Sequence, residues 1–407
     1  MRSFVLVLTI LVFFCSGVAV ALSPGAAGAA TDVPAKPQTG TPQGWNQAAA
    51  AKYLDDREVW WQEWPHAQKD HGTVCISCHT QVPYALARPL LRGAMGEHAV
   101  SDPERVMLDS ILKRVKLGNE AETFYSDAKN GPGKTQEARN AEAVFNAVIL
   151  TSYDAASAEK HLLPETRMAL EAMWALQEKT GPKTGAWIWQ NFHYSPWEAP
   201  ESEYFGAAMV MMSVGSAPDN YRADAKIQGN MTLLRTYLLD KMAQQPIANK
   251  MVLLWASARM PGLLTEAQQE SIANEIYSKQ QSDGGWCLTT LGEGVWDRRD
   301  KTPFETRSDG YATGLALLAL EETDMTRGGQ HADAAKRGIT WLLANQSKAD
   351  GRWPAWSVNK ERDPESGVGK FMSDAGTAFA VMALEEASTL PDTKKSSAKS
   401  AAVSKGR

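Results

Sequence analysis

The stretch QSDGGW at residues 281–286 decides the fold, because the chain repeats its glutamine, glycine and tryptophan. A second copy, QSKADGRW, occupies 346–353, and a third, QEKTGPKTGAW, occupies 177–187. In each copy an amphipathic helix ends near the glutamine, a glycine turn stops the helix, and a tryptophan follows. A tryptophan so placed can pack beneath the preceding helix end, so the pattern predicts helical repeats joined by buried indole rings.

A second helix, rich in apolar and small residues, is expected after each of these turns. The three segments are 203–215, 309–322 and 374–387. Each begins with an acidic side chain, which suits the positive end of a helix dipole. Their glycines and alanines would let neighbouring helices approach closely, so we expect these helices to be the inner ones.

Extending the pattern along the chain gives six helix pairs with a period of roughly 60 residues. Outer helices are predicted near 46–62, 104–118, 164–178, 221–240, 265–280 and 331–346. Inner helices are predicted near 80–94, 138–156, 201–215, 245–259, 308–322 and 373–388. Few segments alternate apolar and polar residues with a period of two, so strands should be scarce. The sequence therefore predicts an all-α fold, an α/α toroid over 46–388, with an open solenoid as the alternative.

The glutamine–tryptophan turns resemble a known repeat. The segments 281–286 and 337–353 are similar to the QW repeats of squalene-hopene cyclases and of the wider prenyltransferase and squalene-oxidase repeat group, over roughly 160–390. The resemblance implies an α/α barrel around an apolar cavity that holds isoprenoid chains.

The chain also departs from this family. It has no D-x-D-D motif to protonate a terminal alkene, and Asp55-Asp56 is the closest acidic pair. It carries one set of six pairs, where triterpene cyclases carry two. The zinc ligands of protein prenyltransferase β-subunits find no counterpart, because Cys287 has no matching Asp and His and reads as a small buried residue. Cyclase activity of the hopene type is therefore not expected.

The string Cys75-Ile76-Ser77-Cys78-His79 is typical of a covalent haem attachment site. Two thiols three positions apart can bond to the two vinyl groups of one haem, and the histidine that follows is placed to ligate the iron. We therefore predict haem c on Cys75 and Cys78, with His79 as the proximal ligand. A disulfide, a structural zinc site and a thioredoxin-like redox pair are the alternatives.

The ends of the chain point to export. Residues 1–21 read as a secretory signal, with a basic start, an apolar stretch and a small-residue cleavage site. Residues 22–45 read as a flexible leader, and residues 389–407 as a disordered basic tail. No segment is long and apolar enough to span a membrane. We expect a periplasmic or extracellular protein, where cytochromes c mature. The net charge is −5 although the tail is basic, so the acidic body excludes nucleic acid as a natural partner.

Long loops should meet at one end of the toroid. Stacking the repeats in register brings loops 187–202, 286–308 and 353–373 beside the connection 66–79, which carries the haem motif. Met372 directly precedes the last inner helix and would reach the iron as its sixth ligand. His193 is the other candidate and an open site the third possibility; we favour Met372.

Other side chains near these loops could line a polar cavity mouth. They are Glu198, Glu201, Glu203, Asp309 and Asp374, and helix capping explains Glu203 and the two aspartates at least as well. His66 and His71 closely precede the haem motif and could be local ligands or hydrogen-bond partners, with surface placement as the default. Two function classes remain open. The first is an exported redox protein that exchanges electrons with a partner protein or acts on a cavity ligand. The second is a toroid that handles isoprenoids or glycans, as an enzyme or a binding module, with a structural cysteine pair.

Overall fold

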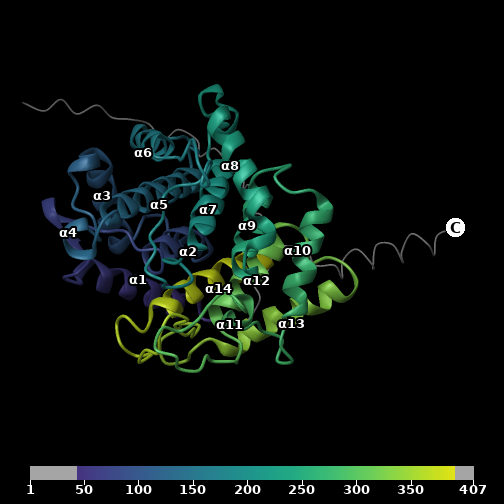
Figure 1. Ribbon diagram of the computed structural model, residues 1–407. Helices are drawn as coiled ribbons and strands as arrows, with labels where there is room; N and C mark the ends of the chain where they lie inside the picture. The colour runs from purple at the N-terminus through teal and green to yellow at the C-terminus, as the bar shows by residue number, and fades with distance from the viewer. Residues whose placement is uncertain (1–43, 390–407) are drawn as a thin grey trace, which may run out of the picture. The chain divides into compact units, whose positions relative to one another are not determined.

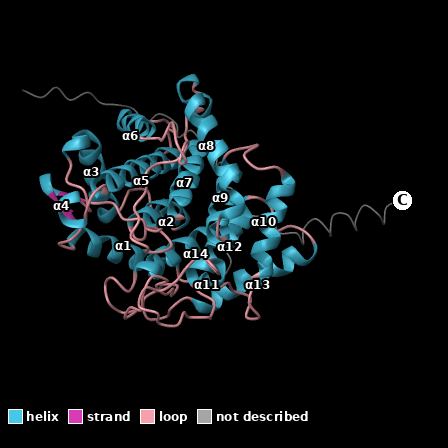
Figure 2. Cartoon of the chain, viewed as in Figure 1, coloured by secondary structure: helices cyan, strands magenta, loops and turns pink. Residues whose placement is uncertain are grey.

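The computed structural model of the protein describes residues 44–389, which belong to one compact unit. The predicted signal at 1–21, most of the leader at 22–45 and nearly all of the tail at 389–407 lie outside the described residues. The described part is predominantly helical, and Figure 2 shows helices almost throughout, joined by loops. The all-α prediction is confirmed.

Six outer helices lie within a few residues of the predicted segments. They are α1 (Gln47–Glu63), α3 (Asp102–Leu117), α6 (Pro164–Ala175), α8 (Gln228–Lys241), α10 (Glu266–Ser278) and α13 (Gly329–Asn345). The fourth begins later than the predicted 221, because Tyr221–Ala223 and Ala225–Ile227 form the 3-10 turns η3 and η4 instead. Figure 1 shows these six helices towards the periphery.

Six inner helices follow them in strict alternation. They are α2 (Gln81–Ala94), α5 (Lys134–Ala156), α7 (Ser202–Ser216), α9 (Ile247–Arg259), α12 (Gly310–Glu322) and α14 (Phe371–Thr389). Nearly every residue of α7 and α12 is buried, as expected for helices that are apolar on all faces. The inner helices therefore supply most of the core.

Short elements complete the described part. They are the strands β1 (Gln68–Lys69) and β2 (Thr73–Val74), the helices α4 (Asp127–Asn130) and α11 (Leu288–Leu291), and the 3-10 turns η1 (Asp70–Gly72), η2 (Gly118–Glu120) and η5 (Met242–Gln244). The two strands pair antiparallel within the connection from α1 to α2.

The inner helices contact one another in a circuit. α2 packs against α5, α5 against α7, α7 against α9, α9 against α12, α12 against α14, and α14 against α2. Each outer helix packs on an inner neighbour: α1 on α2, α3 and α6 on α5, α8 on α7, α10 on α9 and α13 on α12. The last inner helix thus lies beside the first.

The repeated turns fasten neighbouring repeats in the same way three times. The buried indoles of Trp187, Trp286 and Trp353 donate to the carbonyls of Met173, Ile276 and Leu342 in the preceding outer helices. A glutamine then links each turn glycine to the next outer helix through its Nε2. These glutamines are Gln177, Gln280 and Gln346, and their second partners are the carbonyls of Asn230, Ala334 and Asn46.

This geometry corrects one detail of the sequence analysis. The bridging glutamine of the middle repeat is Gln280, whereas Gln281 donates to the carbonyl of Thr306. The third bridge reaches Asn46, directly before α1, so it joins the last repeat to the first. Gly351 lies at the same junction with a φ of +82°, and a Cβ there would come within 2.4 Å of the Ala49 carbonyl carbon.

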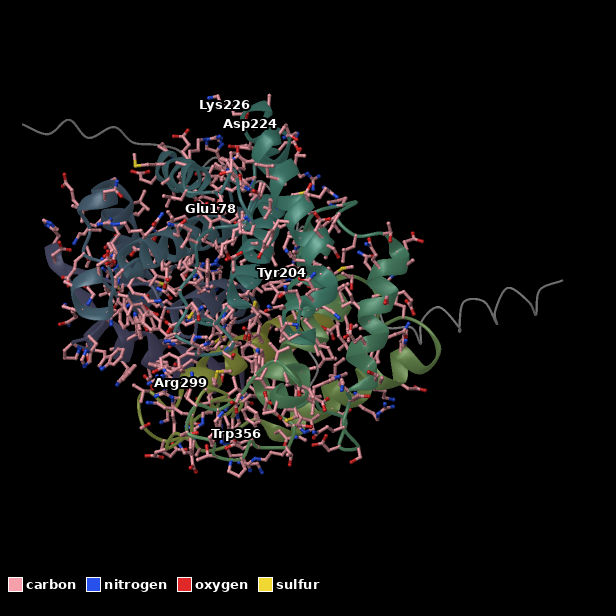
Figure 3. All side chains as sticks on the ribbon, in the orientation of Figure 1. Glu178, Tyr204, Asp224, Lys226, Arg299 and Trp356 are labelled. Atoms are coloured by element: carbon pink, nitrogen blue, oxygen red, sulfur yellow. The ribbon has the colours of Figure 1, made fainter. Side chains whose placement is uncertain are left out.

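The loops that follow the turns gather at one end of the helices. Figure 3 shows Arg299 and Trp356 at that end, and Asp224 and Lys226 at the other. The Arg299 amide donates to the Asn359 carbonyl, which ties two of these loops together. Within residues 44–389, no helix combines the length and the apolarity needed to cross a membrane.

Candidate functional site

The connection between α1 and α2 holds the Cys75–His79 motif in a fixed conformation. The Trp61 indole of α1 donates to the Cys75 carbonyl at 2.7 Å. The Cys75 amide donates to the Ala67 carbonyl at 2.9 Å, which continues the small hairpin. Ser77 Oγ accepts from the amides of Thr80 and Gln81 and so starts α2.

Both cysteines of the motif are buried free thiols. Burial raises the pKa of Cys75 to about 12 and raises that of Cys78 well above its usual value. Both shifts disfavour a free thiolate at either position. Among residues 44–389 no group of three or more His, Cys, Asp or Glu side chains could hold a metal ion.

The His79 ring is held by a chain of hydrogen bonds that ends at an ion pair. His79 Nδ1 lies 2.9 Å from Thr80 Oγ1, and Thr80 Oγ1 lies 2.8 Å from Asp374 Oδ2. Asp374 also accepts from Tyr53 and, through both oxygens, from Arg57. Because the carboxylate can only accept, the threonine hydroxyl donates to it and accepts from the His79 Nδ1–H.

This chain of hydrogen bonds fixes the chemical state of the imidazole. A proton on Nδ1 leaves the lone pair of His79 on Nε2, the state that binds a metal. Burial lowers the pKa of His79 well below its usual value, and the positive charges of Arg57 and Arg362 lower it further. The ring is neutral at physiological pH.

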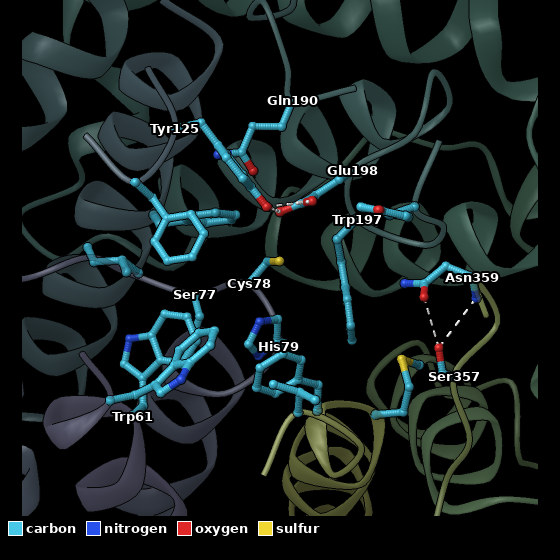
Figure 4. A pocket seen from close by; sticks show the side chains of 18 of the residues that line it. Trp61, Ser77, Cys78, His79, Tyr125, Gln190, Trp197, Glu198, Ser357 and Asn359 are labelled. Atoms are coloured by element: carbon cyan, nitrogen blue, oxygen red, sulfur yellow. Dashed lines mark hydrogen bonds between the residues drawn. The ribbon is translucent and has the colours of Figure 1, made fainter. Parts of the chain in front are cut away.

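A cavity of about 230 Å³ lies beside Cys78 and His79. Its apolar lining comes from Trp61, Trp64, Ile76, Phe124, Phe145, Trp197, Val368, Phe371 and Met372. Its polar lining comes from Ser77, Tyr125, Gln190, Tyr194, Glu198, Ser357, Asn359 and Arg362. The Phe371 ring stacks on His79 with centroids 3.6 Å apart. In Figure 4, Glu198 and Tyr125 lie on one side of Cys78, and His79 and Trp61 on the other.

The two predicted iron ligands from distant parts of the sequence differ in their surroundings. Met372 is buried and lines the same cavity as His79. His193 is exposed and lines a separate surface depression with Ser195 and Arg299. Of these two, only Met372 lies with the motif. Cys75 is buried but is not part of the cavity lining.

The predicted histidines and glutamates near the cavity mouth lie in different surroundings. His66 and His71 are exposed. Glu201 accepts from the Ser195 hydroxyl, and Glu203 accepts from Tyr237 and pairs with Lys183. Of the three glutamates expected near a cavity mouth, Glu198 alone lines the cavity.

Asp309 and Asp374 were both predicted to start inner helices, but their side chains make different hydrogen bonds. Asp309 accepts from the amides of Leu288 and Ala312, so it caps α12. Asp374 belongs to the His79 chain of hydrogen bonds. Cys287 is buried next to Thr289 and the Glu305 carbonyl, as expected for a packing residue.

The sequence analysis missed two parts of this site. One is the Thr80–Asp374–Arg57 chain, whose members lie about 300 residues apart. The other is Arg362, which reads as one charge among several in a polar loop. The one sequence signal for Arg362 was the expectation that its loop, 353–373, lies at the same end of the helices as residues 66–79.

Comparisons with known proteins add no relative. No protein-family description matches the chain, and no curated protein is similar to it.

Proposed function

We propose that this chain is an exported c-type haem protein, which carries out electron transfer or haem-dependent chemistry at one end of an α/α toroid. The main support is that Cys78, His79 and Met372 line one cavity, where the Thr80–Asp374 chain leaves the His79 Nε2 free. The C-x-x-C-H spacing and the predicted signal at 1–21 add independent support, since cytochromes c mature after export.

The residues present suit a covalently held haem. Cys75 and Cys78 form no disulfide, so both thiols could form thioether bonds, and His79 would be the proximal ligand. Met372 would be the sixth ligand, which raises the reduction potential relative to a second histidine. A haem bound here would supply one-electron chemistry at its iron. The protein's own contribution is to orient His79, keep it neutral and shield the site with aromatic rings.

The proposal includes the closed form of the fold. The circuit of inner-helix contacts supports a toroid, as does the Gln346 bridge to Asn46. An open solenoid would leave its first and last repeats apart.

A second candidate function is binding of an apolar ligand without haem. The aromatic lining of Trp61, Trp64, Phe124 and Phe371 favours it, because such walls suit isoprenoid-like chains. A partner protein for electron exchange belongs to the first candidate, and an apolar cavity ligand belongs to the second.

Absorbance after covalent maturation separates the two candidates. The full chain is expressed with cytochrome c maturation machinery, and the purified product is extracted with acid acetone. We expect the colour to stay on the protein and to vanish in the Cys75→Ser, Cys78→Ser double variant. Cys287→Ser is the control and should keep full colour. A colourless parent protein, or colour that washes out, contradicts the haem proposal.

The sixth ligand is tested on the coloured protein. Ferric haem with a methionine ligand has a weak near-infrared band, and Met372→Ala should remove it while His193→Ala leaves it unchanged. If the parent lacks the band and His193→Ala alters the spectrum, His193 is the ligand.

A further inference from the structure

A guanidinium without an anionic partner lies in the cavity beside His79. Arg362 is half-buried, and its one hydrogen bond to the residues that the structure describes is a 3.4 Å contact from Nη2 to Asn359 Oδ1. Within residues 44–389 no carboxylate oxygen lies within 4.0 Å of its nitrogens, the limit for an ion pair. Burial lowers the pKa of Arg362 and outweighs the opposing effects of Tyr194, Glu198 and Tyr125, so the protein compensates its charge only in part.

The fully buried arginines of the described part show how the protein compensates such a charge elsewhere. Each of the buried arginines in the described part pairs with a carboxylate; they are Arg57, Arg88, Arg114, Arg298 and Arg352. Burial acts to lower the pKa of Arg114 too, but the hydrogen bond and charge of Glu142, together with smaller effects of Cys75 and Asp70, outweigh burial and raise that pKa. A buried guanidinium left without a carboxylate is costly unless a ligand supplies one.

The nearest acid in the cavity does not supply this partner. Both oxygens of Glu198 accept from the Tyr125 hydroxyl at 3.0 Å. The Glu198 carbonyl accepts from the amides of Phe192 and Tyr194, and its own amide donates to the Tyr194 carbonyl. These bonds fix the loop that carries Glu198, so the cavity keeps the acid and Arg362 apart.

The space between them has a defined chemistry. Trp197 and Phe371 contribute flat apolar surfaces, and both rings contact the His79 ring, at 6.0 and 3.6 Å between centroids. Aromatic walls favour a flat ligand, and a guanidinium favours a carboxylate, which it can bind through two parallel hydrogen bonds.

We propose that Arg362 binds the carboxylate of a planar aromatic group held in this cavity, with Asn359 beside it. Two sources share this chemistry, a propionate of the bound haem and a separate aromatic acid. The haem propionate rests on the proposed function, whereas the separate aromatic acid does not.

Two measurements on the full matured protein distinguish these sources. The first is the haem reduction potential, and the second is calorimetric titration with benzoate as the probe. Each uses the parent, Arg362→Leu and Arg362→Lys, with Arg235→Leu as the control because Arg235 lies on α8 outside the cavity. Arg362→Gln serves as a second neutral variant if Arg362→Leu does not fold.

A haem propionate predicts that the potential falls in Arg362→Leu, because a positive charge next to the haem favours its reduced form. The potential should recover in Arg362→Lys, and benzoate should not bind the parent. A separate aromatic acid predicts that the parent binds benzoate, and that Arg362→Leu weakens binding about tenfold or more. Benzoate binding by the parent is therefore the result that separates the two sources.

The proposal is overturned if neither the potential nor the benzoate affinity differs between the parent and Arg362→Leu. If the protein carries no haem, the proposed function has failed, and the benzoate titration alone decides. A tenfold loss then supports the carboxylate site, and an absence of binding to the parent refutes it.

Discussion

The first connection, which carries the haem motif, and the last turn use the same hydrogen bond in opposite directions. In the last turn the loop residue Trp353 donates its indole N–H to the Leu342 carbonyl in the outer helix. In the first connection Trp61 lies in the outer helix and donates to the loop carbonyl of Cys75. The loop of the first repeat is thereby held from outside, so its own positions can carry thiols and a ligand instead of a buried ring.

Two threonines show the same difference between a residue that fastens a turn and a residue that serves the cavity. The hydroxyl of Thr313 in α12 accepts from the Trp286 amide, which fastens a repeat turn. The hydroxyl of Thr80, directly before α2, links His79 to Asp374 instead. Similar positions at the start of inner helices thus fasten a turn in one repeat and orient the His79 ring in another.

The largest expected effect is the loss of stability when the buried tryptophan of the last repeat turn is removed. Trp353 is fully buried, so Trp353→Ala should lower the free energy of unfolding by about 3–5 kcal/mol. Trp64→Ala is the matched variant in the first connection, and it should cost less because Trp64 is only half-buried. Denaturant unfolding measures both. Equal losses of unfolding free energy would mean that the burial of these two rings does not set the cost of removing them.

The next effect concerns the junction of the last repeat with the first. Gly351→Ala adds both a strained backbone, at φ +82°, and a clash with Ala49. Gly131→Ala, at φ +97° with open space around it, adds the strain alone. We expect Gly131→Ala to lower the free energy of unfolding by about 1 kcal/mol, and Gly351→Ala to lower it by about 1–3 kcal/mol more. Indistinguishable melting curves would show that the junction is loose.

A smaller effect should separate the two threonines. Thr313→Val and Thr80→Val each remove one buried hydroxyl, at a cost of about 1 kcal/mol in stability. Only Thr80→Val should also alter the haem spectrum and the reduction potential, because it releases the His79 Nδ1–H. A spectrum changed equally by both variants, or by neither, would remove the special role of Thr80.

The smallest effect is a pH dependence that both regions share. Burial raises the pKa of Glu58 on α1 and that of Asp309 before α12 to about 7. A folded pKa above the unfolded value means that stability is fully present below the unfolded pKa and is lost as pH rises through about 7. The free energy of unfolding should therefore fall between about pH 5 and pH 8.

Neutral substitutions test this pH dependence one region at a time. Glu58→Gln and Asp309→Asn should each flatten the decline, measured by urea unfolding at several pH values. The exposed residue Glu293 gives the control Glu293→Gln, which should leave the slope unchanged. A slope that persists in the double variant would assign it to other groups.

The sequence predicted the helices well because their signals are local. Glycine turns, the apolar inner segments and the acidic helix starts placed all twelve long helices. It singled out Cys75, Cys78 and His79 from their spacing, and haem attachment there stays a prediction. The structure brings Cys78, His79, Met372 and Glu198 to one cavity, as the shared end of the loops predicted. The carboxylate behind His79 and the unpaired Arg362 depend on side chains that meet only after the repeats close. Gln281 was assigned a bridge that Gln280 makes, since adjacent glutamines look alike until the register is known.

The junction at Asn46 has a consequence for how the chain folds. The Asn46 amide donates to Gln346 Oε1, the Gln346 side chain donates back to the Asn46 carbonyl, and Gln47 bonds to Glu385. These contacts span 300 residues or more, so they raise the contact order and can form only after almost the entire chain is made. Until then the first helix lacks its last neighbours, and the cysteine motif behind it is more accessible than in the finished protein. The same adjacency suits circular permutation: a short linker between the two ends of the helical body, with new termini at the exposed turn around Gly262, should preserve every repeat interface.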